Sequence, residues 1–140
     1  MKIATFNINS IRGRLQHLLA WLADAKPEVV CLQELRIYDS EFPLAAIRAA
    51  GYGAMWQGQQ PRYNGVAILA RDAEPIEVRR GLPGDPDDSQ ARYLEAAING
   101  VLVKSIEEPF TAGRLTRGRC VMLKSADPAT SEMGISSSRH

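Results

Sequence analysis

Two polar side chains, Asn7 and Glu34, each follow a short apolar run of the sequence. An amide oxygen beside a carboxylate suits a hard cation such as Mg²⁺, which takes oxygen ligands and keeps several of its waters. The alternative is structural, because Asn and Glu at the end of a strand also serve as turn residues or helix caps. The spacing alone leaves both interpretations open.

The elements that would position these two side chains are a strand, a helix and a second strand. Residues 2–8 predict the first strand, and the continuously apolar segment Val29–Leu32 predicts a second strand that is covered on both faces. A crossover helix between them makes the two strands parallel. Because the carboxyl ends of parallel strands meet at one edge of a sheet, we expect Asn7 and Glu34 to lie side by side there.

The crossover helix shows a clear start, face and end. Asn9 or Ser10 can cap its first turn through a side-chain oxygen, and Pro27 ends it. Leucines at helical spacing predict the face turned to a core: Leu15, Leu18, Leu19 and Leu22.

The chain from residue 36 to residue 103 predicts a further helix and several strands. Residues 36–42 and 81–90 have loop composition, and Asn99-Gly100 is the turn pair typical of a β-hairpin. The expected elements are a helix over residues 44–50 and strands over residues 52–56, 64–70, 75–79, 92–98 and 101–103.

Composition excludes several classes of protein. The 140 residues match the length of one domain, and 45% hydrophobic with 24% charged residues is ordinary for a globular protein. The formal net charge of +1 means that any binding to DNA would rely on local basic groups. Neither a signal-peptide pattern nor a membrane-length apolar run is present. Cys31 and Cys120 lack metal-type spacing, so we expect Cys31 to be a buried free thiol and the protein to be cytoplasmic.

Six motifs follow one another along the chain: Phe6–Arg12, Cys31–Glu34, Phe42-Pro43, Gly51-Tyr52, Tyr63–Leu69 and Arg79–Asp85. Together they resemble the bacterial exonuclease III family of apurinic/apyrimidinic (AP) endonucleases, in the endonuclease/exonuclease/phosphatase superfamily. One motif alone would be weak, whereas six in register are specific. The resemblance covers Met1 to about Val103.

The resemblance implies a fold and a chemistry. The fold is a four-layer α/β sandwich of the DNase I type, with the active site at one edge between two mixed sheets. The activity is Mg²⁺- or Mn²⁺-dependent hydrolysis of double-stranded DNA, 5′ to abasic sites and from 3′ ends. By position, Glu34 matches the family's metal-binding glutamate, and Asn7 matches the asparagine beside it.

Three further residues are candidates for contact with DNA. Arg12, Arg14 and Tyr63 are expected on loops near the same edge, where arginine suits a DNA phosphate. The alternative for each is an ordinary solvated surface residue. Arg92 lies in the stretch that leads to the strand behind the site and is not expected to be catalytic.

Beyond Val103 the chain departs from the family's pattern. The family continues with a Tyr-x-Pro segment, an Asp-x-Asn motif that supplies the water-activating residue, and a Ser-Asp-His segment, and this sequence contains none of them. We therefore expect residues 1–104 to be the N-terminal part of the domain. Residues 105–140 are expected to be a divergent tail that is poorly ordered, apart from a short strand near Cys120.

Two consequences would follow from this departure. The chain would build about one mixed sheet with flanking helices, and the inner face of that sheet would stay exposed. It would also be truncated and inactive alone, because general acid–base groups are missing. The alternatives are a non-catalytic fragment that needs a partner sheet, or a phosphatase or phosphodiesterase of the same superfamily. Residues 79–85 resemble the DNA-repair branch and argue against the phosphatase.

Overall fold

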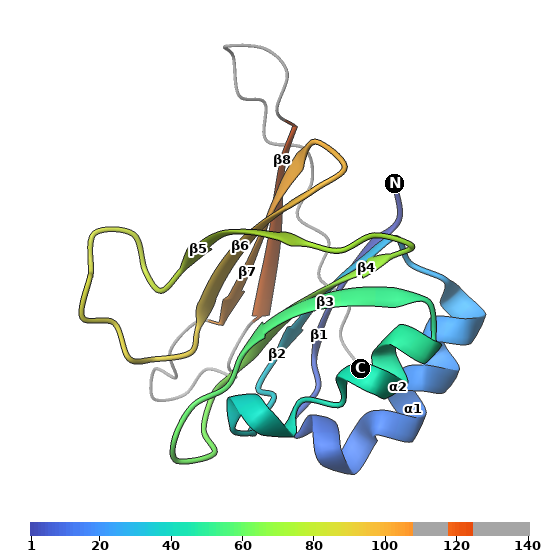
Figure 1. Cartoon of the computed structure of the whole chain (residues 1–140), viewed down its shortest axis with the longest axis horizontal. Helices are drawn as coiled ribbons and strands as arrows, with labels where there is room; N and C mark the ends of the chain where they lie inside the picture. Colours follow the sequence, from blue (N-terminus) through green and yellow to red (C-terminus); the bar gives the residue numbers. More distant parts are fainter. Residues whose placement is uncertain (108–117, 125–140) are drawn as a thin grey trace.

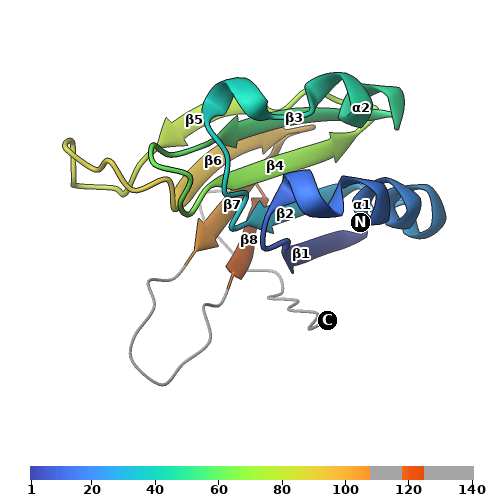
Figure 2. The same cartoon turned by 90° about the horizontal axis from the view of Figure 1, so that it is seen from below.

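Two four-stranded β-sheets lie face to face, with helices on the outer side of one of them (Figures 1 and 2). The computed structural model describes residues 1–107 and 118–124. None of the helices in these ranges is long and apolar enough to cross a membrane.

The first sheet has the strand order β1-β2-β4-β3 and is mixed, since β1 and β2 are parallel and the other pairs are antiparallel. Its outer face packs against the leucine face of α1 and against α2, around a core that includes Leu18, Leu22 and Ile47. The elements are β1 (Ile3–Asn7), α1 (Ile11–Ala25), β2 (Val29–Gln33), the 3₁₀ turn η1 (Asp39–Glu41), α2 (Leu44–Ala49), β3 (Tyr52–Gln57) and β4 (Val66–Arg71).

The strand–helix–strand prediction at the N-terminus is confirmed. β1 and β2 pair in parallel, and the register sets Asn7 opposite Gln33. The side chain of Ser10 caps α1 by accepting a hydrogen bond from the N–H of Gly13 at 3.4 Å. All five residues of β2 are buried, as continuous apolarity predicted.

The second sheet is an antiparallel meander in the order β5-β6-β7-β8. Asn99 and Gly100 form the turn between β6 and β7 with φ of 49° and 78°, as their composition predicted. The elements are β5 (Ile76–Arg80), β6 (Tyr93–Ile98), β7 (Val101–Glu107) and β8 (Gly118–Lys124).

The expectation of about one sheet with an exposed inner face is wrong. The inner face of the first sheet is covered by the second, and the two share a buried apolar cluster. The expectation failed because the sequences of β6 and β7 show only that their residues alternate between the two faces of a sheet. That pattern does not tell which other sheet the inward residues meet. From the first sheet the cluster takes Val29, Cys31, Met55, Val66, Ile68 and Ala70, and from the second Leu94, Ala96, Ile98, Val101, Val103 and Cys120.

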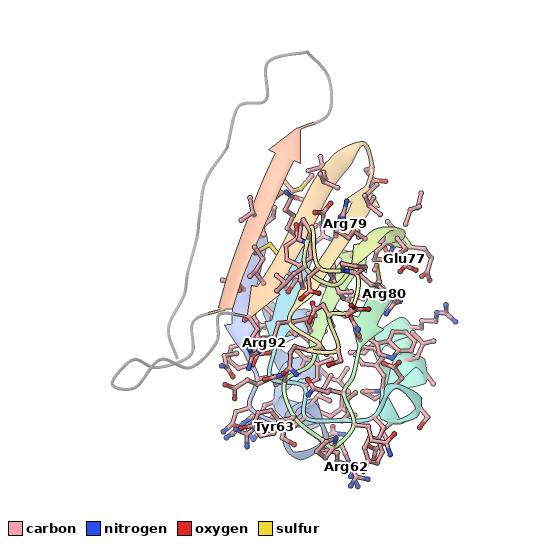
Figure 3. All side chains as sticks on the ribbon, turned by 90° about the vertical axis from the view of Figure 1, so that its left-hand side faces the viewer. Arg62, Tyr63, Glu77, Arg79, Arg80 and Arg92 are labelled. Carbon is pink, nitrogen blue, oxygen red and sulfur yellow. A yellow bond between two sulfur atoms is a disulfide. The ribbon has the colours of Figure 1, made fainter. Side chains whose placement is uncertain are left out.

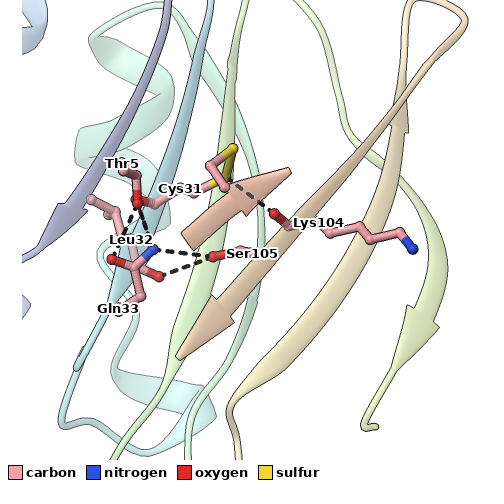
Figure 4. Close-up of a disulfide and its surroundings, with 7 residues drawn as sticks. Thr5, Cys31, Leu32, Gln33, Lys104 and Ser105 are labelled. Carbon is pink, nitrogen blue, oxygen red and sulfur yellow. Dashed lines mark hydrogen bonds between the residues drawn. A yellow bond between two sulfur atoms is a disulfide. The ribbon is translucent and has the colours of Figure 1, made fainter. Parts of the chain in front are cut away.

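Cys31 is buried, as expected, but the expectation of a free thiol is wrong. The structure joins Cys31 to Cys120 of β8 in a disulfide between the two sheets, with Cα atoms 5.8 Å apart (Figure 4). A separation of 89 residues in sequence gives no sign that two cysteines will face each other. The cytoplasmic location remains a prediction.

The region beyond Lys104 carries more regular structure than the motifs indicated. β7 runs on to Glu107, and β8 pairs with it along its length, from Val101 opposite Lys124 to Glu107 opposite Gly118. The short strand expected near Cys120 is therefore confirmed. The rest of the expected tail lies outside the described residues.

Candidate active site

Asn7 and Glu34 lie at the same edge of the first sheet. Asn7 is the last residue of β1. Glu34 comes directly after Gln33, which is the last residue of the neighbouring strand β2. Backbone hydrogen bonds carry the pairing past the strand ends, from the N–H of Ile8 to the oxygen of Gln33 at 3.0 Å and from the N–H of Ser10 to the oxygen of Glu34 at 2.9 Å. The prediction that the two residues meet at one edge is confirmed at the level of the backbone.

The turn that presents Glu34 has an unusual backbone. Glu34 and Arg36 both have φ of 52°, in the left-handed region that residues with a Cβ rarely adopt. The turn is held by hydrogen bonds from the N–H of Leu35 to the oxygen of Gly65, at 3.1 Å, and from that of Arg36 to Asn64, at 2.9 Å. Gly65 has φ of 102°, and a Cβ there would meet the Cβ of Leu35 at 2.9 Å. A glycine is therefore needed at residue 65 for this approach.

The Glu34 carboxylate is only partly accessible and has a basic neighbour. Its side chain is 14% exposed, and the Arg36 guanidinium lies 3.4 Å from Oε2. Asn7 uses its side-chain oxygen to accept a hydrogen bond from the N–H of Asn9 at 3.1 Å. Both side chains thus place oxygen atoms that can act as metal ligands at the edge between the two sheets.

Sequence reasoning missed a second carboxylate at this edge, that of Glu107. It ends β7, is 4% exposed, and accepts a hydrogen bond at Oε2 from the N–H of Glu34 at 3.3 Å. Burial, aided by the negative charge of Glu34, raises the pKa of Glu107 to about 7 against the opposing effects of the Glu34 N–H, Arg92 and Arg36. The signal that could have found it is the inward alternation of Val101, Val103 and Ser105, which the next step extends to residue 107.

A buried polar network lies directly behind the turn (Figure 4). The side chain of Gln33 is fully buried, and its Nε2 donates to the hydroxyl of Thr5 at 3.0 Å and to that of Ser105 at 3.5 Å. Ser105 in turn donates to the oxygen of Leu32 at 3.4 Å. The network connects β1, β2 and β7 next to Asn7 and Glu34.

The candidate DNA contacts occupy two kinds of surroundings. The expectation of loops is wrong for Arg12 and Arg14, which lie in the first turn of α1, because the helix begins directly after its Ser10 cap. All three side chains are exposed, Tyr63 at 62%, but Arg12 also pairs with Glu41 at 3.1 Å. The same Glu41 receives a two-point contact from Arg62, at 2.8 and 2.9 Å. Contact with DNA remains a prediction for all three candidates.

Arg92 lies on the same side of the molecule as Arg62 and Tyr63 (Figure 3). Nε of Arg92 is buried and has no hydrogen-bond partner within the part of the chain that the structure describes. Its backbone oxygen accepts from the N–H of Glu107 at 2.8 Å. The contacts of Arg92 are therefore with the end of β7, and they assign it no step in a reaction.

The donor set at this edge fits a hard divalent cation. Asn7 and Glu34 offer an amide and a carboxylate oxygen, the ligand types that Mg²⁺ and Mn²⁺ prefer. No group of three or more His, Cys, Asp or Glu side chains suited to a metal occurs within residues 1–107 and 118–124. A cation held by two protein oxygens would keep most of its shell for water and for phosphate oxygens.

Comparisons with known proteins agree with this fold. The model of the endonuclease/exonuclease/phosphatase family matches residues 4–118, beyond Val103, where the motif resemblance ends. The chain belongs to the endonuclease/exonuclease/phosphatase family. Within it, the chain is 40% identical to exodeoxyribonuclease III of Haemophilus influenzae over 98 residues, which are 70% of this chain and 36% of that protein. An exodeoxyribonuclease of Bacillus subtilis is 26% identical over 84% of this chain and 46% of its own length.

Solved structures resemble the same part of the fold. The 3′ phosphatase NExo from Neisseria, bound to product DNA hairpin, is 42% identical with a TM-score of 0.71, over 76% of this chain and 40% of that one. An AP endonuclease from Archaeoglobus fulgidus is 41% identical with a TM-score of 0.65, over 71% and 38%. These similarities confirm the family resemblance and the DNase I-like fold. The chain spans less than half the length of the curated relatives it matches.

Proposed function

We propose that this chain forms the metal-binding part of an exonuclease III-type DNA-repair nuclease. The reaction would hydrolyse phosphodiesters of double-stranded DNA 5′ to abasic sites and from 3′ ends, in the cytoplasm. The observation that carries the proposal is the convergence of Asn7 and Glu34 at one sheet edge, in a chain 40% identical to an exodeoxyribonuclease III. The DNA hairpin bound to the Neisseria relative supports DNA as the partner.

In this proposal each residue has a limited task. Asn7 and Glu34 would bind Mg²⁺ or Mn²⁺, and the bound cation would stabilise the negative charge of the phosphate and of the leaving oxygen. Arg36, whose guanidinium lies 3.4 Å from Oε2 of Glu34, would help to orient that carboxylate. Arg12, Arg14 and Tyr63 would contact the DNA backbone, which positions the duplex without reading its sequence.

We further propose that the chain alone hydrolyses DNA slowly or not at all. The only histidine among the described residues, His17, is an exposed residue of α1. A positioned general acid or base is worth roughly 10²–10⁴-fold in rate, so a site without one would be slow. Because this chain aligns with only 36% and 46% of the two relatives, the remaining groups can come from a segment that corresponds to their C-terminal part.

The test uses two proteins: the chain itself, and a chimera that joins residues 1–104 to the C-terminal part of the Haemophilus relative. Each is incubated with a duplex carrying one abasic site, with Mg²⁺ or with EDTA. We expect EDTA-sensitive nicking by the chimera only, lost in Glu34→Ala and kept in Glu74→Ala, a control at an exposed acid. A folded chimera that does not nick would contradict the nuclease function, and nicking by the chain alone would contradict its inactivity.

A second candidate function, removal of 3′ phosphates from DNA, is favoured by the 42% identity to the Neisseria 3′ phosphatase. The same chimera would be offered a duplex with a 3′ phosphate in place of the abasic site. Release of inorganic phosphate without nicking would favour the phosphatase over the AP endonuclease. If folded chimera acts on neither substrate, a non-catalytic role becomes the better interpretation.

A further inference from the structure

The turn that carries Glu34 is tied to the second sheet by one buried side chain. Oε2 of Glu107 accepts the hydrogen bond from the Glu34 N–H at 3.3 Å, and Glu107 is 4% exposed. The backbone of Glu107 is itself fixed, because its N–H donates to the oxygen of Arg92 at 2.8 Å. The acceptor is thus placed by β7 and by the residue that precedes β6, whereas the donor belongs to the turn that follows β2 of the first sheet.

The backbone of Glu34 gives this contact its importance. A left-handed residue with a Cβ costs roughly 1–2 kcal/mol, so the turn persists only if its surroundings hold it. The next two N–H groups, of Leu35 and Arg36, are bonded within the first sheet's own loops, to Gly65 and Asn64. Glu107 is the acceptor that the structure gives to the N–H of Glu34. A buried N–H without an acceptor would cost about 1–3 kcal/mol and would favour another turn conformation.

The neighbouring residues show the same attachment. Leu32 accepts a hydrogen bond from Ser105, Gln33 donates one to Ser105, and Glu34 donates one to Glu107. The last two residues of β2 and the residue that follows it are therefore bonded to two inward side chains of β7 (Figure 4 shows the first two contacts). The contact at Glu107 is the last of the series and the one nearest the proposed metal ligands.

We propose that Glu107 is a positioning residue for the metal-binding turn, and that its hydrogen bond to the Glu34 N–H holds the Glu34 carboxylate beside Asn7. This inference rests on the metal site of the proposed function. Glu107 acts here as an acceptor and not as a metal ligand. A glutamine, which keeps a carbonyl oxygen at the same distance along the side chain, should therefore replace it, whereas a leucine should not.

Binding of Mn²⁺ to the purified full chain, measured from the loss of its free EPR signal, is the first readout. We expect Glu107→Gln to keep near wild-type affinity and Glu107→Leu to lose about 10-fold or more, the range found for residues that orient metal ligands. Glu95→Gln is the matched control, since Glu95 is a buried acid of the same sheet, 7% exposed, on β6. It should leave the affinity unchanged.

Amide hydrogen exchange of the metal-free chain, followed by NMR, is the second readout. In Glu107→Leu the amide of Glu34 should lose its protection, while those of Leu35 and Arg36 keep theirs because their acceptors are Gly65 and Asn64. These two amides are internal controls for local folding. In Glu107→Gln all three amides should stay protected.

Each result decides the proposal. Wild-type affinity and wild-type protection in Glu107→Leu would overturn it, and so would a loss of affinity in Glu107→Gln as large as in Glu107→Leu, which would indicate a ligand or a required charge. If Glu107→Leu does not fold, Glu107→Gln must still keep both affinity and protection, or the proposal is wrong. Equal Mn²⁺ affinity in Glu34→Ala and wild type would instead reject the proposed metal site, while the exchange data would still judge the contact.

Discussion

The two sheets of this chain differ in how many of their faces are covered. β2, inside the first sheet, is buried at all five positions, whereas β5, at the edge of the second, is exposed at all five. Helices α1 and α2 pack on the first sheet, and the described residues place no helix on the outer face of the second (Figure 2). Stability should therefore concentrate in the first sheet, which also carries Asn7 and Glu34.

The difference also separates two tasks. The first sheet supplies the candidate metal ligands from its strand ends, and the second supplies the contacts behind them, through Ser105 and Glu107 of β7. A site at an edge between sheets depends on both, since the ligand lies on one sheet and its support on the other.

The largest effect is expected for truncation of a side chain in the covered sheet. Leu32 is fully buried in β2 against the helices, so Leu32→Ala should lower the free energy of unfolding by about 2–5 kcal/mol. The matched change on the open sheet is Ile76→Ala, at a residue that is 68% exposed, and it should cost no more than about 0.5 kcal/mol. Urea unfolding followed by circular dichroism measures both. Similar losses would mean that the second sheet is covered in solution.

The next effect is expected at the network between the sheets. Gln33→Leu would leave the hydroxyl of Thr5 without its partner inside the protein, and should cost about 1–3 kcal/mol of unfolding free energy. Gln16→Leu, on the exposed side of α1, is the matched control. A double-mutant cycle with Ser105→Ala should show coupling between Gln33 and Ser105. Additive losses would mean that the 3.5 Å contact contributes nothing to the docking of the sheets.

These two sheets also show what the sequence could and could not predict. The run Val29–Leu32 predicted burial on both faces, because continuous apolarity in a strand has few other causes. The ends of α1 and the Asn99-Gly100 turn were predictable because each depends on residues close in sequence. The meeting of Cys31 with Cys120, and of Glu34 with Glu107, depends on how two sheets stack, and no local pattern encodes that. The sequence therefore predicted the site residues at the edge of the first sheet, Asn7 and Glu34, but not Glu107 of the second sheet.

Two carboxylates should give the two regions opposite responses to pH. Burial raises the pKa of Glu107 to about 7, so the folded chain binds a proton there that the unfolded chain, with an ordinary pKa of 4.5, has released. Stability from this group is present below pH 4.5 and is lost as pH rises through about 7, by on the order of 2 kcal/mol. Glu107→Gln should remove this fall, measured as unfolding midpoints in metal-free buffer between pH 4.5 and 8.

Glu41 near the helices should show the reverse trend. Hydrogen bonds from Arg62 and from the N–H of Tyr38 lower the pKa of Glu41 to about 2. Its stabilising effect is therefore present above pH 4.5 and is lost as pH falls through about 2. Glu41→Gln should make the chain less sensitive to acid in that range, and it should leave the fall between pH 4.5 and 7 unchanged. A variant that alters both ranges would show that the two regions are coupled.

The smallest effect is expected at the surface, where the two sheets should differ in contact with DNA. Arg14 lies in the first turn of α1, which follows the strand end that carries Asn7, so Arg14→Ala should weaken binding to a short duplex and lower the salt slope of log K by about 1. Arg79→Ala removes an equally basic side chain from β5, where Arg79 lies 3.9 Å from Glu95. It should leave the slope unchanged. Fluorescence anisotropy at several salt concentrations measures both variants in the absence of metal. If Arg79→Ala changes the slope and Arg14→Ala does not, the duplex lies along the second sheet, and the edge with Asn7 and Glu34 is not the DNA-binding surface.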